Sequence, residues 1–566
     1  MSVRNILFIM CDQLRWDYLS CYGHPHLHTP NIDALAARGV RYERAYVQSP
    51  VCGPSRMSTY TGRYVHAHGA SWNFVPLKAG EMTIGDHLRP YGVKSVLIGK
   101  THMRADTSGM ARLGIDPESS IGVRISECGF EPFERDDGIH PYSGHDPAPP
   151  YNDYLRKADC PGENPWEEWA NAAEGPDGEL LSGWFLKYAN RPARVPDEHS
   201  ETPYITSRAM DFIDAAGDQP WVAHVSYIKP HWPYIVPEPY ASMYGPEHLL
   251  PVKRHEDERR DPHPVYAAMQ DHRVSKSFAR DEVRERVIPA YMGLIKQIDD
   301  QMGRLFAHLE KRGIADETMI VFTSDHGDYL GDHWMGDKDL FHEQAIRVPL
   351  IVHDPDPRAD ATRGSVNTDL VEMIDLAPTF LDVYGGAPVP HVMDGISLRP
   401  GLFGEATAKR DHVICEYDYS FQDARVTLQT KARDAWLRMI SDGRWKYVIA
   451  EGFRPMLFDL ENDPDEYHDL GGQPGHEETI ARLHEALFCW ARQPRQRVTV
   501  PDGAIESTFV QEKIAEGGIL IGYWDEAELE EAIRKEWHPR FAAANPLIGP
   551  TLKKLLRKTD RQETEQ

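Results

Sequence analysis

The 566-residue sequence lacks the features that mark disulfide-stabilised and membrane-spanning proteins. Its seven cysteines are odd in number and include no Cys-x-x-Cys pair, which argues against a disulfide framework and for reduced thiols. No apolar run approaches the length of a membrane span, and we find no signal peptide at the N-terminus. From these absences we expect a cytoplasmic protein without a membrane partner.

Basic residues are also fewer than acidic ones. Lys and Arg number 62 against 88 Asp and Glu, which gives a formal charge of -26. The average surface therefore repels nucleic-acid phosphates and anionic lipid, so no nucleic acid is expected as a partner. A metal ion and a few cations can still reverse the field inside one pocket. The apolar content of 41% is typical of a chain with a sizeable buried core.

Alternating strand and helix patterns predict an α/β domain over residues 1–400. Apolar runs of strand length occur at 3–11, 95–98, 221–228, 319–323 and 348–353. Helical patterns between them include 29–39, 206–216 and 290–312. This alternation is typical of a largely parallel or mixed buried sheet flanked by helices. Residues 104–200 break the rhythm, and they are either a lid or substrate wall or a surface insertion.

After about residue 400 the pattern changes to short strands. Strand runs at 412–416, 435–440, 445–450 and 456–460, then a helix near 477–491, predict a small antiparallel α+β domain over 401–499. Residues 500–566 form a predicted helical tail whose apolar positions have no core of their own: Ile519, Leu520, Ile521, Leu547, Leu552 and Leu556. We expect this tail to pack on a partner subunit in a homo-oligomer, a dimer or tetramer.

Cys52-Gly53-Pro54-Ser55-Arg56 is the most informative pentapeptide. The residues after it can form a helix that starts at Pro54. Cys52 would then lie at a helix N-terminus, where backbone N–H groups and the helix dipole favour an anion. Arg56 adds a cation that can bind an anion through two hydrogen bonds. A cysteine beside a helix start can also be purely structural, so other parts of the chain must support a functional interpretation.

Two predicted strands end in polar residues that suit a metal ion. Asp12-Gln13 follows the strand at 3–11, and Ser324-Asp325-His326-Gly327-Asp328 follows the strand at 319–323. Strand ends of one α/β sheet open on the same edge, which is where such folds bind ligands. Taken separately, either segment could be only a turn or a helix cap.

Together these segments resemble the sulfatase family of the alkaline phosphatase superfamily. The Cys-x-Pro-x-Arg spacing at Cys52 is similar to the sulfatase signature, and further similar segments follow in the same order: Gly99-Lys100-Thr101-His102, Lys229-Pro230-His231-Trp232-Pro233-Tyr234, Lys338 and Met456-Leu457-Phe458-Asp459. The resemblance implies an alkaline-phosphatase-like fold. It also implies that a formylglycine-generating enzyme oxidises Cys52 to formylglycine during maturation.

The resemblance implies one divalent ion held by Asp12, Gln13, Asp325 and His326. Many sulfatases have Asp-Asp and Asp-Asn at these positions and bind calcium. Gln13 and His326 resemble the phosphonate monoester hydrolase branch instead, and an imidazole ligand suits manganese better than calcium.

Roles for the other residues also follow from the resemblance. A hydroxyl of the hydrated aldehyde would attack sulfur or phosphorus, while Arg56, Lys100 and Asn73 offset charge on the nonbridging oxygens. On the leaving-group side, His231 would donate a proton and Lys338 would supply a cation. His102 would take a proton from the other hydroxyl.

The site pattern is a hybrid of two branches. Lys100 and His102 follow the sulfatase pattern, whereas Gln13, Asn73 and His326 resemble the phosphonate branch. We expect arylsulfatase activity on small sulfate esters, with phosphonate monoesters and phosphodiesters as side substrates. The alternatives are an enzyme that prefers those phosphorus esters, and a non-catalytic anion-binding protein that keeps Cys52 as a thiol. A serine hydrolase built on Ser55 is disfavoured because the Gly-x-Ser-x-Gly motif is missing there.

Overall fold

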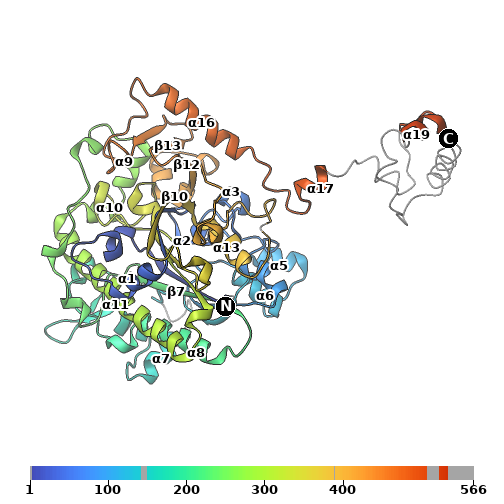
Figure 1. Ribbon diagram of the computed structural model, residues 1–566. Coiled ribbons are helices and arrows are strands. Elements are labelled where there is room, and N and C mark those ends of the chain that lie inside the picture. Colours follow the sequence, from blue (N-terminus) through green and yellow to red (C-terminus); the bar gives the residue numbers. More distant parts are fainter. Residues whose placement is uncertain (1–2, 142–148, 388, 507–521, 533–566) are drawn as a thin grey trace. The chain divides into compact units, whose positions relative to one another are not determined.

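The computed structural model describes residues 3–141, 149–387, 389–506 and 522–532 (Figure 1). The chain forms two compact units, one of residues 1–389 and 393–493 and one of residues 390–392 and 494–566. All seven cysteines lie in the described residues and all are free thiols, as their number and spacing predicted. No helix among the described residues is long and apolar enough to span a bilayer.

An eight-stranded mixed sheet forms the centre of the larger unit, in the order β10-β2-β9-β8-β1-β7-β3-β4. Its strands are β1 (Asn5–Asp12), β2 (Val40–Tyr46), β3 (Lys94–Gly99), β4 (Glu131–Arg135), β7 (Trp221–Pro230), β8 (Thr318–Ser324), β9 (Arg347–His353) and β10 (Ser365–Glu372). Strand β9 runs antiparallel to β2 and β8, and the other pairs are parallel. The predicted α/β fold with a mixed sheet is confirmed.

Helices cover both faces of this sheet, and β1 shows why. Its alternating side chains divide between two hydrophobic clusters, with Leu7 and Ile9 in one and Phe8 and Met10 in the other. The first cluster includes residues of α1 (Pro30–Arg38), α8 (Glu201–Ala215) and α11 (Asp281–Arg312). The second includes residues of α2 (Cys52–Thr61), α4 (Ile84–Leu88) and α13 (Leu376–Val383). Burial on both faces explains the continuous apolar sequence of the central strands.

A smaller antiparallel sheet follows in the order β11-β12-β13-β14. Its strands are β11 (Val413–Asp418), β12 (Trp436–Ser441), β13 (Trp445–Ala450) and β14 (Met456–Asp459), and α16 (Glu477–Ala491) follows them. Ile440 and Tyr447 share a cluster with Leu483 and Leu487 of α16. The other face, which includes Met439, belongs to the same hydrophobic cluster as the α2 side of the large sheet. The predicted small α+β element is therefore present and is packed against the large sheet.

Residues 104–200 contain more regular structure than their composition indicates. They carry α5 (Thr107–Leu113), α6 (Ser120–Ser126), the edge strand β4, α7 (Pro150–Lys157) and a hairpin of β5 (Ala172–Glu174) and β6 (Leu180–Ser182). In the predicted tail, short helices α17 (Asp502–Glu506) and α19 (Glu526–Ala532) are described. The apolar tail positions on which the oligomer prediction rests, 519–521, 547, 552 and 556, lie outside the described residues.

Candidate active site

The carboxyl ends of β1 and β8 bring the predicted acidic residues together. The two strands are parallel neighbours with Cys11 opposite Ser324. Asp12 ends β1, and Asp325 follows β8, with its amide donating to the Cys11 carbonyl at 3.2 Å. Asp12, Asp325 and His326 are all fully buried. Their location fits the rule that α/β folds bind ligands at the carboxyl edge of parallel strands.

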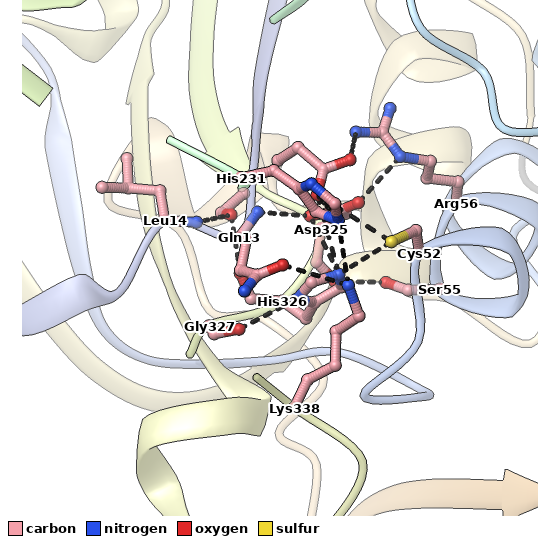
Figure 2. Close-up of polar contacts among 12 residues, drawn as sticks. Gln13, Leu14, Cys52, Ser55, Arg56, His231, Asp325, His326, Gly327 and Lys338 are labelled. Atoms are coloured by element: carbon pink, nitrogen blue, oxygen red, sulfur yellow. Dashed lines mark hydrogen bonds and ion pairs between the residues drawn. The ribbon is translucent and has the colours of Figure 1, made fainter. Parts of the chain in front are cut away.

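Cys52 occupies the first turn of α2, next to these residues. The helix starts at Cys52 and not at Pro54, because Val51 has the extended backbone of a cap residue. The Cys52 Sγ lies 3.0 Å from His326 Nε2 and 3.8 Å from Asp12 Oδ1 (Figure 2). Asn73 Oδ1 accepts a hydrogen bond from the amide of the next residue, Gly53, at 2.8 Å. The predicted oxyanion contact Asn73 thus lies at this helix start, and its NH2 group has no hydrogen-bond partner among the described residues.

Arg56 ties the two carboxylates to the neighbouring strand ends. Its Nε donates to Asp325 Oδ2 at 2.8 Å, and its Nη2 donates to Asp12 Oδ2 at 3.2 Å. Its Nη1 donates to the Lys100 carbonyl at 3.0 Å and to Ser226 Oγ at 2.7 Å. Four of the five N–H donors of the guanidinium are therefore in use. In this geometry Arg56 fixes the carboxylates, and its guanidinium also lies beside the Tyr60 hydroxyl.

Lys100 and His102 follow β3 and reach the same centre. The Lys100 Nζ lies 2.6 Å from Asp12 Oδ2. The His102 side chain lies beside Cys52 and helps to lower the pKa of that thiol, and its Nδ1 is buried with no hydrogen-bond partner among the described residues. The His102 backbone has a positive φ of 53°, and its amide donates to Asp137 Oδ1 at 3.0 Å. Asp137 thus positions this turn, although it lies in residues 104–200, where no sequence motif marked it.

Lys338 and His231 form a hydrogen-bonded pair beside Gln13. The Lys338 Nζ lies 3.2 Å from His231 Nε2 and donates to Gln13 Oε1 at 3.0 Å. His231 Nδ1 lies 2.7 Å from the Trp232 carbonyl, which can only accept, so Nδ1 carries the proton and Nε2 accepts from Lys338. Burial opposes the charge of Lys338, but Asp337 and other acidic neighbours outweigh it and hold the pKa of the ammonium well above its usual value.

Gln13 is held by two residues to which the sequence analysis gave no role. Its Nε2 donates to Asp328 Oδ2 at 2.6 Å and lies 3.3 Å from the Tyr234 hydroxyl. Tyr234 in turn donates to Asp328 at 2.5 Å. Burial and then Asp337 raise the pKa of Asp328 to about 6. Both residues belong to segments that the resemblance singled out, which is the signal that could have identified them.

The converging atoms suit a divalent cation. Each carboxylate gives its Oδ2 to Arg56, while Asp12 Oδ1 and Asp325 Oδ1 lie 3.9 and 3.7 Å from His326 Nε2. Ligand atoms of Asp12, Asp325, His326 and Cys52 all lie within 4.8 Å of one another. His326 Nδ1 donates to the Gly327 carbonyl at 2.9 Å, which turns Nε2 toward this group (Figure 2).

Electrostatics agree with this fit. Burial opposes protonation of His326, but Asp325 and Cys52 outweigh it and raise the pKa of the imidazole to about 9. The potential at the converging atoms therefore favours positive charge, as a cation site requires. Gln13, the fourth predicted ligand, lies next to this group, but its amide oxygen accepts from Lys338. The structure thus brings three of the four predicted ligands together and directs Gln13 toward Lys338.

Burial also opposes ionisation of the Cys52 thiol. Lys338 and His326 outweigh that effect and hold the pKa of Cys52 well below its usual value. A negative charge at position 52 is therefore stabilised by its surroundings. The site as a whole can bind a small tetrahedral anion against the start of α2, with cations on both sides.

Comparison with known proteins agrees with this geometry. The family model described as sulfatase matches residues 4–386, and a model for the C-terminal region of N-sulphoglucosamine sulphohydrolase matches residues 331–493. A multifunctional alkaline phosphatase superfamily protein, PehA of Trinickia caryophylli, is 31% identical over 515 residues, which cover 87% of this chain and 95% of that protein. An arylsulfatase of Clostridium perfringens is 27% identical over 506 residues, 86% of this chain and 93% of its own.

Solved structures extend the comparison. A phosphonate monoester hydrolase of Silicibacter pomeroyi superimposes with a TM-score of 0.75 at 28% identity and covers 88% of this chain and 96% of its own. One from Agrobacterium radiobacter gives a TM-score of 0.74 at 26% identity, with 87% and 96% covered. Since the family model spans more than half of the sequence and these relatives align over nearly all of their own length, the chain belongs to the sulfatase family and is a hydrolase.

Proposed function

We propose that the protein hydrolyses aryl and other small sulfate monoesters, using formylglycine at position 52 and one divalent metal ion. Phosphonate monoesters and phosphodiesters are further substrates in this proposal. The observation that carries it is the position of Cys52, which begins α2 with its Sγ 3.0 Å from His326 Nε2 and 3.8 Å from Asp12. A side chain at this point meets the candidate metal ligands, Lys100 and His102 at once.

Asp12, Asp325 and His326 would hold the metal ion, and their mixed oxygen and nitrogen donors suit manganese better than calcium. The hydrated formylglycine would supply a geminal hydroxyl as nucleophile, and the ion would lower the pKa of that hydroxyl. Arg56 keeps both carboxylates in place by binding the oxygens that face away from His326.

The chain's own residues divide the remaining tasks. Lys100 and the NH2 group of Asn73 are placed to bind nonbridging oxygens of a group held at position 52. Lys338 holds a proton that is hydrogen-bonded to His231 Nε2, so this pair can pass it to the leaving oxygen. His102, which lies beside Cys52, can accept a proton at the same position.

Charge favours singly charged substrates. Sulfate monoesters, phosphodiesters and phosphonate monoesters carry one negative charge on the transferring group, whereas phosphate monoesters carry up to two. The cations of the site already face the buried carboxylates of Asp12 and Asp325, which limits the positive charge available to a dianion.

A second candidate is an enzyme whose leading substrates are phosphonate monoesters or phosphodiesters. The structural match to two phosphonate monoester hydrolases favours it, as do Gln13 and His326 by their type. Lys100, which is paired with Asp12, and His102, which lies beside Cys52, favour sulfate.

One comparison tests the proposal. The catalytic efficiency is measured on an aryl sulfate, a phenylphosphonate ester, a phosphodiester and a phosphate monoester under one condition, with protein whose Cys52 peptide has been examined by mass spectrometry. We expect formylglycine in that peptide and the highest efficiency on the sulfate. A leading phosphonate ester or diester would support the second candidate, and a leading phosphate monoester would contradict the charge argument. Fully active protein with only a free thiol would overturn the formylglycine assignment.

A further inference from the structure

A large cavity of about 810 Å³ adjoins the segment that follows His231. This volume lies in the range of pockets that enclose a small organic molecule. Its walls come from residues 183–191, from Trp232 to Tyr234, and from α10 (Arg273–Phe278) with the first turns of α11. Residues 183–191 belong to the stretch that was predicted to be either a substrate wall or a surface insertion, and here they line a cavity.

The cavity shares a wall with the leaving-group side of the active centre. The ring of Trp232 lies against that of His231, with 4.4 Å between centroids. Asp337, which also lines the cavity, lies 3.4 Å from Lys338 Nζ. On the side of the reacting position, His231 Nε2 lies 3.9 Å from Asp12 Oδ1, which in turn lies 3.8 Å from the Cys52 Sγ. The pair that would protonate a leaving oxygen therefore lies between the reacting position and the cavity.

The charge of the cavity is opposite to that of the protein as a whole. Its charged lining consists of two acidic residues, Glu282 and Asp337, and five cations: Lys187, Arg191, Arg273, Arg280 and Arg286. The chain carries a formal charge of -26. Within the described part of the chain, the side chains of Lys187, Arg191 and Arg273 have no acidic partner. Unpaired cations gathered in a concave site raise the local concentration of anions.

Aromatic rings line the same cavity. Trp184 and Trp232 lie 6.1 Å apart between centroids, and both face it together with Phe185 and Tyr188. Phe185 is 61% exposed, although its ring lies 6.4 Å from that of Tyr188 between centroids. Flat rings of this kind stack on a planar ligand.

From this juxtaposition we propose that the cavity binds the alcohol part of the ester and selects a flat ring that carries a carboxylate. The ring stacks on the tryptophans, and the carboxylate pairs with Arg273 and Lys187. The inference rests on the proposed function, because it takes position 52 as the reacting centre. It adds the chemical class of the leaving alcohol, an anionic aromatic hydroxyl compound.

A binding measurement tests the cavity without any turnover. The full-length Cys52→Ala protein is titrated by calorimetry with 4-hydroxybenzoate and with its neutral counterpart 4-hydroxybenzamide. We expect the carboxylate to bind at least about fivefold more tightly, which is the scale of one partly exposed ion pair. Arg273→Gln should remove most of that preference.

A matched control lies on the same helix. Lys276 belongs to α10 but does not line the cavity, and it pairs with Asp271 at 2.6 Å. Lys276→Gln removes the same charge and should leave the preference for the carboxylate unchanged. Equal binding of the two probes, or a preference that survives both Arg273→Gln and Lys187→Gln, would overturn the inference.

Turnover separates this inference from the proposed function. The sulfate esters of the same two compounds are compared in wild-type and Arg273→Gln enzyme, so that their different intrinsic reactivities cancel. We expect the substitution to lower the efficiency on the carboxylate ester about fivefold relative to the amide, through KM. Hydrolysis of both esters with an unchanged ratio would contradict the cavity assignment alone. Hydrolysis of neither would contradict the proposed function, and the binding measurement would then decide the inference by itself.

Discussion

The charged residues of the active centre are buried and paired, whereas cations of the cavity beside it are exposed. In the centre, Arg56, Asp12 and Asp325 are fully buried, and each is bound to another of the three. In the cavity, Arg273 and Lys187 are exposed and have no acidic partner in the described residues. Buried ion pairs are costly to break, whereas exposed charges contribute little to stability. The groups proposed for catalysis are therefore held in place by ion pairs. The groups proposed to select the substrate are exposed and can bind it.

The largest effect should come from Cys52. Cys52→Ala removes the proposed nucleophile while leaving the cavity intact, so the efficiency on aryl sulfate should fall by at least about 10⁴-fold. Steady-state kinetics measures this, and the binding of 4-hydroxybenzoate to the same variant shows that the fold persists. A variant that keeps wild-type turnover would show that catalysis does not depend on position 52.

Asp325 should combine a loss of metal with a loss of stability. Asp325→Ala leaves the buried Arg56 without its 2.8 Å partner, so we expect a fall in the free energy of unfolding of about 3 kcal/mol in urea. Elemental analysis should show that the bound ion is lost as well. The control is Asp316→Ala, an exposed residue before the start of β8, which should change stability by less than about 0.5 kcal/mol. Stoichiometric metal in Asp325→Ala would refute the ligand assignment.

Lys338 lies between the two regions, and its effect should depend on the substrate. Lys338→Gln removes the cation that is hydrogen-bonded to His231. For sulfates of weakly acidic alcohols, which need a proton as they leave, we expect a loss of about 10²-fold. For 4-nitrophenyl sulfate, whose leaving group is stable as an anion, the loss should be nearer tenfold. A plot of log kcat/KM against leaving-group pKa should steepen in the variant, and parallel lines for variant and wild type would place Lys338 outside proton transfer.

The cavity itself should give the smallest effect. Phe185→Ala trims an exposed ring from its wall, so KM for a naphthyl sulfate should rise about threefold while kcat stays constant. Thermal stability should not change, because the ring is not part of a hydrophobic core. A fall in kcat with constant KM would mean that this ring shapes the reacting centre and would break the division between the two regions.

Much of the catalytic sheet is predictable because burial on both faces forces continuous apolar runs. Strands β1, β7 and β8 were located for this reason, and the site residues at their ends could then be placed. Strands β2, β4 and β10 were not located. All three carry charged residues that are not fully buried, such as Arg44, Glu131 and Asp369, and β4 and β10 also lie at the sheet edges. A strand that has neither a continuous apolar run nor a strict alternation of apolar and polar residues is hard to separate from a loop.

The contacts within the site are harder to predict than its members. Resemblance named Gln13 and Lys338, but not the 3.0 Å hydrogen bond between them. Lys338 lies between Asp337 and Asp339, which both have positive φ, and local sequence does not reveal such a backbone for non-glycine residues. The cavity could not be predicted from the sequence either, because residues 183–191 and α10 meet only through the tertiary fold.

The burial of the segment from Cys52 to Arg56 determines when Cys52 can be oxidised. Every residue from Cys52 to Arg56 is buried in the first turns of α2. An oxidising enzyme that reads Cys52, Pro54 and Arg56 cannot reach these side chains once the helix has docked on the sheet. The oxidation that we propose must therefore precede folding, and a molecule that folds first keeps its thiol. The specific activity of a preparation would then depend on how often Cys52 is oxidised before its segment folds, rather than on the quality of the folded protein.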